Sequence, residues 1–381
     1  ALDWYEQAYE EVQDVDVAMK IARLYYFLRD YVKAERSYTR AFRKDRKEVY
    51  FEERLTFAQC LKMNGKYDEA IKEFESYISK STDEAKKEQA QIELEGAKFA
   101  RIAPDAKNMT VSNAGQNVNS SYSEYSAVLA PGGQKMYYSS FNSEEIIVVD
   151  KNNTDYFAKI FTADRTAEGW SKGVALDEKI NRPDYHNSNV TLSPDGKRMF
   201  FTRQLLSGNV VSESKIYMSE FKSGGWTPAN EVEGVNGAYI ANHPAVGELF
   251  GSEVLFFTSD MEGGQGGMDI YYSSYKGGKY GQPLPLSPKI NTTGDEYTPY
   301  YRDGILYFSS TGHPGLGGFD IFSSEWNGAV WSEPVNMGKG YNSSVDDLYF
   351  MLDESGYSGF LLSNRPGTRW LKSKGKTCCD D

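Results

Sequence analysis

Three acidic residues recur at equivalent places in a repeated pattern and are the first candidates for chemistry. Glu124, Glu296 and Asp347 each lie at the predicted start of a strand that opens a repeat unit. Successive strands of such a unit alternate in direction, so the loops before the first strand and after the second share one face. We predict that this face presents a partial ring of carboxylates suited to a cation or a basic peptide. Hydrogen bonding of these carboxylates to turn amides is the alternative, and the one we favour.

Other patterns of catalytic or metal chemistry are weak. The glycine-rich segment 263–267 precedes a strand and lacks the helix, lysine and hydroxyl residue of a phosphate-binding loop. The segment Gly169-Trp170-Ser171-Lys172-Gly173 matches the Gly-x-Ser-x-Gly pattern of a nucleophilic serine, but no predicted helix follows it. The three histidines, His186, His243 and His313, are far apart and have no obvious carboxylate partners. We therefore predict no catalytic residues, no metal site and no cofactor.

Charge and cysteine content exclude further classes. The net charge of -12 disfavours binding to nucleic acid, because an acidic surface repels phosphates. No long apolar run predicts a transmembrane segment. Cys60 lies in an apolar helical stretch and is predicted to be a core residue, whereas Cys378 and Cys379 are adjacent near the end. Three cysteines so placed exclude a disulfide framework.

A change in composition divides the chain. Residues 1–103 lack proline, whereas glycine, tyrosine, serine and asparagine dominate from Pro104 onward. We predict a helical domain over residues 1–104 and a β domain over 105–381. In the first domain four residues return 36 positions later: Tyr31, Ala34, Tyr38 and Ala41 become Tyr67, Ala70, Phe74 and Tyr77. This period predicts tetratricopeptide-like repeats, with an unspecialised helical bundle as the alternative.

The second domain contains five copies of a strand with a central aromatic residue. The central residues are Tyr137, Phe200, Phe256, Tyr307 and Phe360, which are 51 to 63 positions apart. This spacing is typical of four-stranded propeller blades and predicts a β-propeller, most simply with five blades. Four units follow an apolar residue and an asparagine, namely Asn181, Asn236, Asn291 and Asn342. Aromatic residues that recur in the outer part of four units are predicted to pack in the core: Trp170, Trp226, Tyr280 and Trp331.

The ends of the second domain suggest how the ring closes. No fourth strand remains for the last unit, so we predict that residues 108–113 form a strand that completes it. Cys378 and Cys379 correspond to Gly267 and Met268, which precede a third strand. The sequence therefore stops inside a unit, and we expect it to be a fragment.

Two features resemble known families. The segment Leu192-Ser193-Pro194-Asp195-Gly196, with a later Asp269-Ile270-Tyr271, resembles the PD40 (WD40-like) propeller repeats of TolB-like proteins. Tetratricopeptide-like helices, then a propeller and the terminal Cys378-Cys379-Asp380-Asp381, resemble Bacteroidetes envelope proteins of the OmpA family, in particular the PorE type of the type IX secretion system. In that family a peptidoglycan-binding domain follows the propeller, and no residue of this sequence corresponds to it.

The resemblance implies a periplasmic protein associated with the outer membrane. We expect a non-catalytic protein–protein interaction scaffold of the secretion or gliding machinery and not an enzyme. Its partners would be other envelope proteins, bound through the helical repeats and the propeller face. Peptidoglycan would be reached only through the missing C-terminal domain. The alternative is binding of a glycan or a peptidoglycan fragment by the propeller face, which predicts exposed aromatic residues around its channel.

Overall fold

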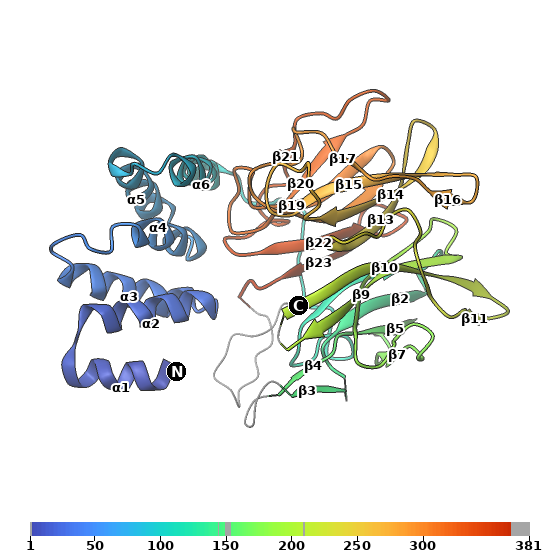
Figure 1. The fold of residues 1–381 in the computed structure, drawn as a ribbon, viewed down its shortest axis with the longest axis horizontal. Helices are drawn as coiled ribbons and strands as arrows, with labels where there is room; N and C mark the ends of the chain where they lie inside the picture. The colour runs from blue at the N-terminus through green and yellow to red at the C-terminus, as the bar shows by residue number, and fades with distance from the viewer. Residues whose placement is uncertain (1, 144, 149–153, 209, 367–381) are drawn as a thin grey trace.

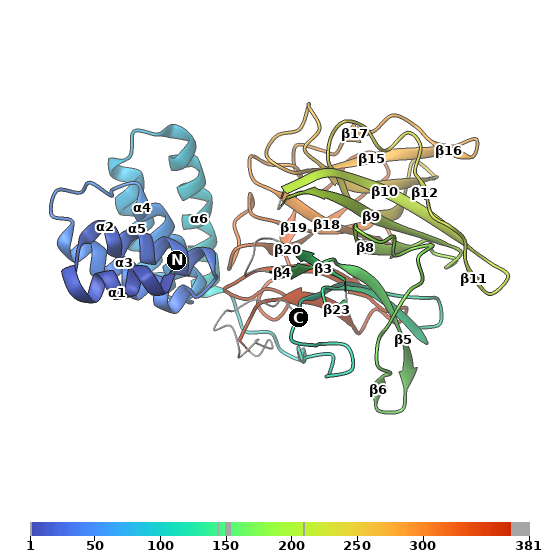
Figure 2. The same cartoon turned by 60° about the horizontal axis from the view of Figure 1, so that its bottom comes forward.

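The computed structural model describes residues 2–143, 145–148, 154–208 and 210–366. Helices come first and strands follow, in two parts that lie side by side (Figures 1 and 2). The helices are α1 (Leu2–Val12), α2 (Val15–Phe27), α3 (Tyr31–Lys44), α4 (Glu53–Met63), α5 (Tyr67–Lys80) and α6 (Glu84–Ile102). None of the described helices is long and apolar enough to cross a membrane.

The recurring residues of the helical part form its core. Ala34, Tyr38, Phe74 and Tyr77 are completely buried. Small alanines let neighbouring helices approach closely, and the aromatic rings fill the space between the pairs. Aspartates begin several helices: the Asp14 carboxylate accepts hydrogen bonds from the first free backbone N–H groups of α2. Cys60 is buried as predicted, and burial raises the pKa of its thiol to about 12.

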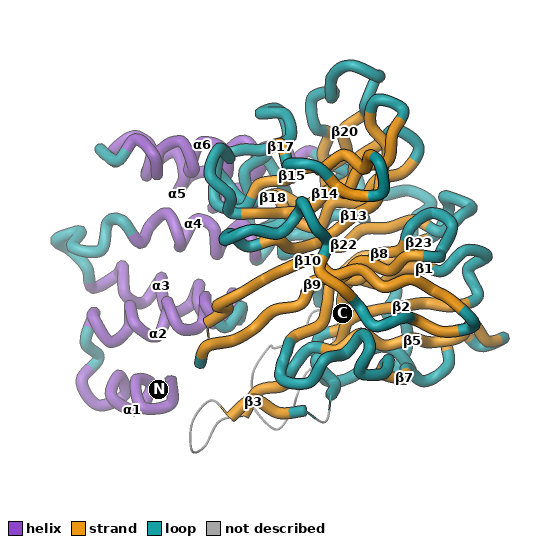
Figure 3. The backbone as a smooth tube through the Cα atoms, turned by 45° about the vertical axis from the view of Figure 1, so that its right-hand side comes forward, coloured by secondary structure: helices purple, strands orange, loops and turns teal. Residues whose placement is uncertain are grey.

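The strands form five sheets around a common axis, with an additional hairpin; Figure 3 shows how they are separated from the helices. Sheet 1 contains β1 (Glu124–Leu129), β2 (Lys135–Ser140), β5 (Lys159–Thr166), β6 (Gly169–Trp170) and β7 (Val174–Ala175). Sheet 2 contains β8 (His186–Leu192), β9 (Arg198–Ser207), β10 (Val210–Lys222), β11 (Gly225–Trp226) and β12 (Asn230–Glu231). Sheet 3 contains β13 (Ala241–Leu249), β14 (Ser252–Ser259), β15 (Asp269–Lys276), β16 (Lys279–Tyr280) and β17 (Leu284–Pro285).

The remaining sheets are smaller. Sheet 4 contains β18 (Glu296–Arg302), β19 (Ile305–Ser310), β20 (Asp320–Glu325) and β21 (Val335–Asn336). Sheet 5 contains β22 (Asp347–Leu352) and β23 (Gly359–Ser363). The hairpin of β3 (Ile146–Val148) and β4 (Thr154–Tyr156) lies between β2 and β5 in the chain. The first strands pack in order, β1 on β8, β13, β18 and β22, and β22 returns to β1. The predicted order, helices and then a β-propeller, is thus confirmed.

Neighbouring sheets are joined by aromatic pairs. Each pair places an outer aromatic residue of one sheet on the second strand of the preceding sheet: Trp170 on Phe360, Trp226 on Tyr137, Tyr280 on Phe200 and Trp331 on Phe256. Ring centroids in these pairs are between 5.9 Å and 6.3 Å apart. The prediction of core packing is confirmed for Trp170, Tyr280 and Trp331, which are buried.

The repeated asparagines clamp each third strand to the loop that follows it. The side-chain amide of Asn291 accepts a hydrogen bond from Ile270 N and donates one to Ile270 O, at 2.9 Å and 3.0 Å. Asn181, Asn236 and Asn342 form the same pair of bonds with the equivalent isoleucine of their own sheets. A buried backbone needs such partners where the sheet ends, which explains why asparagine recurs.

The predicted closing strand at residues 108–113 has no described strand to pair with. Residues 108–113 have no strand assignment, although Met109 lies against Gly340 and Ala114 packs near Phe360 of sheet 5. A strand is defined by hydrogen bonds to a neighbour, and the residues that would supply a third strand of sheet 5 lie outside the described residues. Cys378 and Cys379 also lie outside them.

The helices dock on the loops of sheets 4 and 5. Gly96 of α6 approaches the backbone of Gly315 so closely that a Cβ atom on Gly96 would overlap the Gly315 carbonyl oxygen. Ser344 Oγ donates a hydrogen bond to Met63 O at 2.9 Å, and Arg29 lies 3.8 Å from Asp346. Glycine inside a helix is unfavourable, so this close backbone contact is the reason for Gly96.

Candidate ligand-binding face

The three predicted carboxylates are internal to the sheets. Glu124 accepts hydrogen bonds from Ser120 N at 2.8 Å, Ser120 Oγ at 2.6 Å and Ser140 Oγ at 2.7 Å. Glu296 repeats this arrangement with Thr292 and Ser310. Each carboxylate thus ties the loop before the first strand to the end of the second strand.

Burial keeps these groups from acting as an exposed ring. Glu124, Glu296 and Asp347 are all buried. Burial raises the pKa of Glu296 to about 7, with its hydroxyl and amide donors opposing the shift. Burial also raises the pKa of Asp347, against the effect of Arg365 at 2.5 Å. The predicted carboxylate ring is therefore not presented to a partner, and the alternative of hydrogen bonding within the turns describes what the structure shows.

A different set of five residues surrounds the axis. The register of each first strand shifts at the same place through a β-bulge. One residue of each bulge has a left-handed backbone with φ between 49° and 57°: Ser126, Asn189, His243, Thr298 and Tyr349. Such a conformation is uncommon for residues other than glycine; asparagine and histidine adopt it more readily than serine, threonine and tyrosine. All five line an axial cavity of about 50 Å³.

The phenol of Tyr349 closes this axis. It donates a hydrogen bond to Asn189 Oδ1 at 2.6 Å and lies 3.0 Å from His243 Nε2. Asn189 Nδ2 donates to Asn242 Oδ1 at 2.5 Å, and His243 Nδ1 lies 2.9 Å from Thr258 Oγ1. Every donor meets an acceptor if His243 carries its proton on Nε2. Sheet 5 is thereby connected directly to sheets 2 and 3, which do not adjoin it.

Aromatic rings form a continuous arc across the same face. The order is Phe141, Tyr125, Tyr349, His243, Tyr297 and Phe319, and we call these six residues the aromatic arc. Successive ring centroids are between 5.1 Å and 5.7 Å apart. All six side chains are half-buried, so each keeps part of its surface open. Because first strands begin and second strands end on this face, the arc lies there too.

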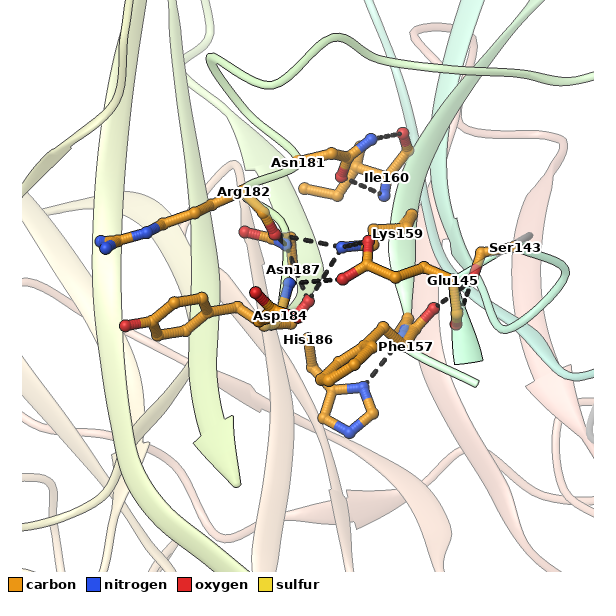
Figure 4. A network of polar contacts seen from close by, with 12 residues as sticks. Ser143, Glu145, Phe157, Lys159, Ile160, Asn181, Arg182, Asp184, His186 and Asn187 are labelled. Atoms are coloured by element: carbon orange, nitrogen blue, oxygen red, sulfur yellow. Dashed lines mark hydrogen bonds and ion pairs between the residues drawn. The ribbon is translucent and has the colours of Figure 1, made fainter. Parts of the chain in front are cut away.

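A polar network supports the sheet 1 end of the arc (Figure 4). The His186 ring contacts Phe141 and Phe157, and its Nδ1 accepts a hydrogen bond from Ala158 N at 2.9 Å. Nearby, the buried Lys159 ammonium lies 2.6 Å from Glu145 and donates to Arg182 O at 3.0 Å. Glu145 also accepts a hydrogen bond from Asp184 N. The network fixes the base of the β3–β4 hairpin against the loop before β8.

The other end of the arc lies at the helical domain. Phe319 follows Gly318, whose Cα lies close to Met63 of α4, and Phe319 N donates to Asp346 at 3.1 Å. His313, on the loop before β20, bonds to Ile290 O instead of joining the arc. The described residues contain no cluster of three or more His, Cys, Asp or Glu side chains placed to hold a metal ion.

Sequence reasoning missed the axial residues, although a signal was present. Each axial residue lies two positions after the residue that corresponds to Glu124 in its unit. Ser126 thus follows Glu124, Thr298 follows Glu296 and Tyr349 follows Asp347. The acidic residues recur in the repeat, whereas the residues two positions later differ from unit to unit. The variation itself, with serine, asparagine, histidine, threonine and tyrosine at one position, was the available signal.

Comparisons with known proteins found similar folds among solved structures. No known protein family and no curated protein matches the sequence. An endo-arabinase from Bacteroides thetaiotaomicron is similar over 67% of this chain and 91% of its own, with 13% identity and a TM-score of 0.39. An α-L-arabinofuranosidase from Lactobacillus brevis is similar over 64% and 82%, with 13% identity and a TM-score of 0.39. A puromycin-hydrolyzing peptidase from Mycobacterium tuberculosis is similar over 68% and 46%, with 14% identity and a TM-score of 0.35.

These findings correct the prediction of a non-catalytic scaffold and the exclusion of enzymes. That prediction treated the combination of a helical repeat and a propeller as characteristic of interaction proteins, yet the three solved structures reported above are named as enzymes. With identities of 13% and 14%, the similarity describes the fold and transfers none of these activities to the chain.

Proposed function

We propose that this protein binds an extended glycan on the propeller face, along the aromatic arc. The observation that carries the proposal is the unbroken series of six half-buried rings beside hydrogen-bonding groups. A sugar ring has an apolar C–H face that stacks on an aromatic ring, and hydroxyls that both donate and accept hydrogen bonds. Tyrosine, histidine and asparagine side chains offer both kinds of contact here.

The arc is suited to a ligand without charge. Burial raises the pKa values of Tyr125 and Tyr297 to about 12 and lowers that of His243 to about 3. These three side chains are therefore neutral near pH 7. The charged pair beside the arc, Lys159 and Glu145, is already compensated internally. A neutral glycan satisfies such a surface, whereas an ion would lose hydration without a partner.

The length of the arc favours an oligosaccharide over a single sugar. It runs from sheet 1 across the axis to sheet 4 and ends beside the helices. The axial cavity of about 50 Å³ is too small for a sugar ring, so the ligand would lie over the arc and not inside the axis. A bound chain that continued past Phe319 would meet the helical domain.

We also propose that the helices are tetratricopeptide-like and that the propeller has five blades. The 36-residue recurrence and the buried alanines support the first, and the return of β22 to β1 supports the second. The resemblance to OmpA-family envelope proteins remains a proposal, with a periplasmic location beside the outer membrane. In that setting a fragment of the peptidoglycan glycan strand is a suitable ligand for the arc.

Calorimetric titration of the whole chain with neutral oligosaccharides and with muropeptides tests the function. Wild type should bind at least one of these, and Tyr297→Ala should weaken that binding about tenfold, because a stacking partner is lost. Tyr297→Phe should retain most of the affinity. Tyr357→Ala is the matched control, since Tyr357 is 96% exposed and lies outside the arc. No heat with any glycan, or equal affinity in Tyr297→Ala, would overturn the proposal. New reducing ends in the same mixtures would reveal turnover.

A further inference from the structure

The joint between sheets 1 and 2 contains an open cleft that the arc does not use. Its volume is about 240 Å³, and its walls include Tyr137, Phe221 and Trp226. Lys135, Thr162 and Asp177 lie around them. Lys135 begins β2, whose other end reaches the arc face, so the cleft lies toward the opposite face of the propeller.

The equivalent joints are closed. Their outer aromatic residues are only 4% to 6% exposed: Trp170, Tyr280 and Trp331. Trp226 occupies the same position but is half-buried. Its neighbour Phe221 is 44% exposed, and the two rings meet edge to face at 5.2 Å. An aromatic pair that packs elsewhere in the core is therefore available to a ligand at this joint.

The joint between sheets 2 and 3 carries an ion pair that this joint lacks. Between sheets 2 and 3, Arg198 forms two hydrogen bonds to Glu253, at 2.8 Å and 2.5 Å, and Tyr280 donates to Glu253 at 2.7 Å. Between sheets 1 and 2, the residues at the positions of Arg198 and Glu253 are Lys135 and Lys197. Two like charges cannot form that bridge.

Lys135 forms its ion pair within its own sheet instead. Its partner is Asp164, which lies opposite it on β5. The bridge of the neighbouring joint is therefore missing at this one, where Phe221 and Trp226 also keep exposed surface.

We propose that this cleft is a second binding site, which holds one pyranose residue stacked on Trp226. An indole face, an edge-on phenyl ring and charged groups at the rim form the surface that a sugar ring with equatorial hydroxyls requires. The cavity volume suits a single ring and not a chain. The ligand class rests on the proposed function, but the residues are separate from the aromatic arc. Sites on opposite faces would let one molecule bridge two glycan segments.

Fluorine NMR of the whole chain labelled with 5-fluorotryptophan tests the site directly. The protein has six tryptophans, and the Trp226 resonance is the one lost in Trp226→Phe. Glucose, galactose and N-acetylglucosamine are the probes. At least one should shift the Trp226 resonance and leave those of Trp170 and Trp331 in place. Phe221→Ala should weaken the affinity about fivefold through loss of the ring contact.

Two further variants keep the test informative if Phe221→Ala perturbs folding. Lys197→Glu should weaken sugar binding by allowing a bridge to Lys135 that closes the cleft. Phe250→Ala is the matched control, because Phe250 is exposed and meets Trp326 edge to face at 5.1 Å at another joint. It should leave the Trp226 shift unchanged.

The outcomes separate this inference from the proposed function. A Trp226 resonance that no sugar moves would overturn the cleft, even if the arc binds oligosaccharides. A Trp226 shift that persists in Tyr297→Ala, with no calorimetric binding at the arc, would support the cleft and reject the arc. If Phe250→Ala reduced the sugar-induced shift of the Trp226 resonance as much as Phe221→Ala does, the sugar would bind elsewhere, and the cleft proposal would also be overturned.

Discussion

Tyr349 Oη and Asn189 Oδ1 are 2.6 Å apart, although the two residues are separated by 160 positions in the chain. The bond crosses the propeller axis and connects the last described sheet to the second. It also fixes the ring at the middle of the aromatic arc, because Tyr349 lies between Tyr125 and His243. One hydroxyl thus links ring closure to the proposed binding surface.

Removing that hydroxyl should weaken the fold more than the surface. Tyr349→Phe keeps the ring but leaves Asn189 Oδ1 and the His243 ring without this partner, so we expect a loss of about 1–3 kcal/mol in the free energy of unfolding. Urea denaturation measures it, and Tyr357→Phe on an exposed turn should show no loss. Equal stability of Tyr349→Phe and wild type would show that the bond across the axis contributes nothing.

Gly96→Ala should loosen the contact between the two parts of the protein. Alanine favours a helix over glycine by about 1 kcal/mol, yet its Cβ would overlap Gly315. We expect faster hydrogen exchange in the loop at 312–318 and a lower melting temperature. Gly225→Ala is the control, since a Cβ there would have no atom within 4 Å. A variant as well protected as wild type would show that the domains do not depend on this contact.

Asp320 should make stability depend on pH near neutrality. Burial raises the pKa of Asp320 to about 7, with Lys62 opposing the shift, from an ordinary value of 3.8. Between these values the folded state holds a proton that the unfolded state has lost, so stability falls as the pH rises from about 4 to 7. Asp320→Asn can still accept the hydrogen bonds from Leu316 N and Asn336.

The Asp320→Asn comparison requires melting temperatures between pH 5 and pH 8. The melting temperature of the variant should rise relative to that of wild type toward pH 8, where wild type carries the buried Asp320 charge. The two melting temperatures should differ least near pH 5. A constant difference across this range would mean that Asp320 does not titrate there.

The ionisation state of His243 should leave glycan binding unchanged between about pH 5 and 9. The arc contains one histidine, and burial lowers the pKa of His243 to about 3 from 6.5. In the unfolded protein His243 takes up a proton at a higher pH than in the folded protein. The free energy of unfolding should therefore fall progressively as the pH falls from 6.5 toward 3. Titrations at several pH values would reveal this, and a break in affinity near pH 6.5 would contradict the neutral assignment of His243.

The sequence predicted the structural role of residues that recur from unit to unit, and it did not predict the role of residues that differ between units. Period and composition predicted the helices, the strand units and the core role of Trp170 and Trp331, because packing demands the same residue type each time. The carboxylates Glu124 and Glu296 also repeat, and for the same reason they proved to be internal. The aromatic arc joins residues from different units, so its members meet only through the curvature of the ring. Only the shared position in the repeat relates Tyr349 to Asn189, and that position does not predict their hydrogen bond.

The bulge at the start of each first strand has a further consequence. One backbone shape is used five times, and it carries five chemically different side chains at the axis. The same shape accommodates all five residue types, and hydrogen bonds across the axis connect three of them, Tyr349, Asn189 and His243. The bulge is in that sense a common frame on which each unit presents a side chain of its own to the axis.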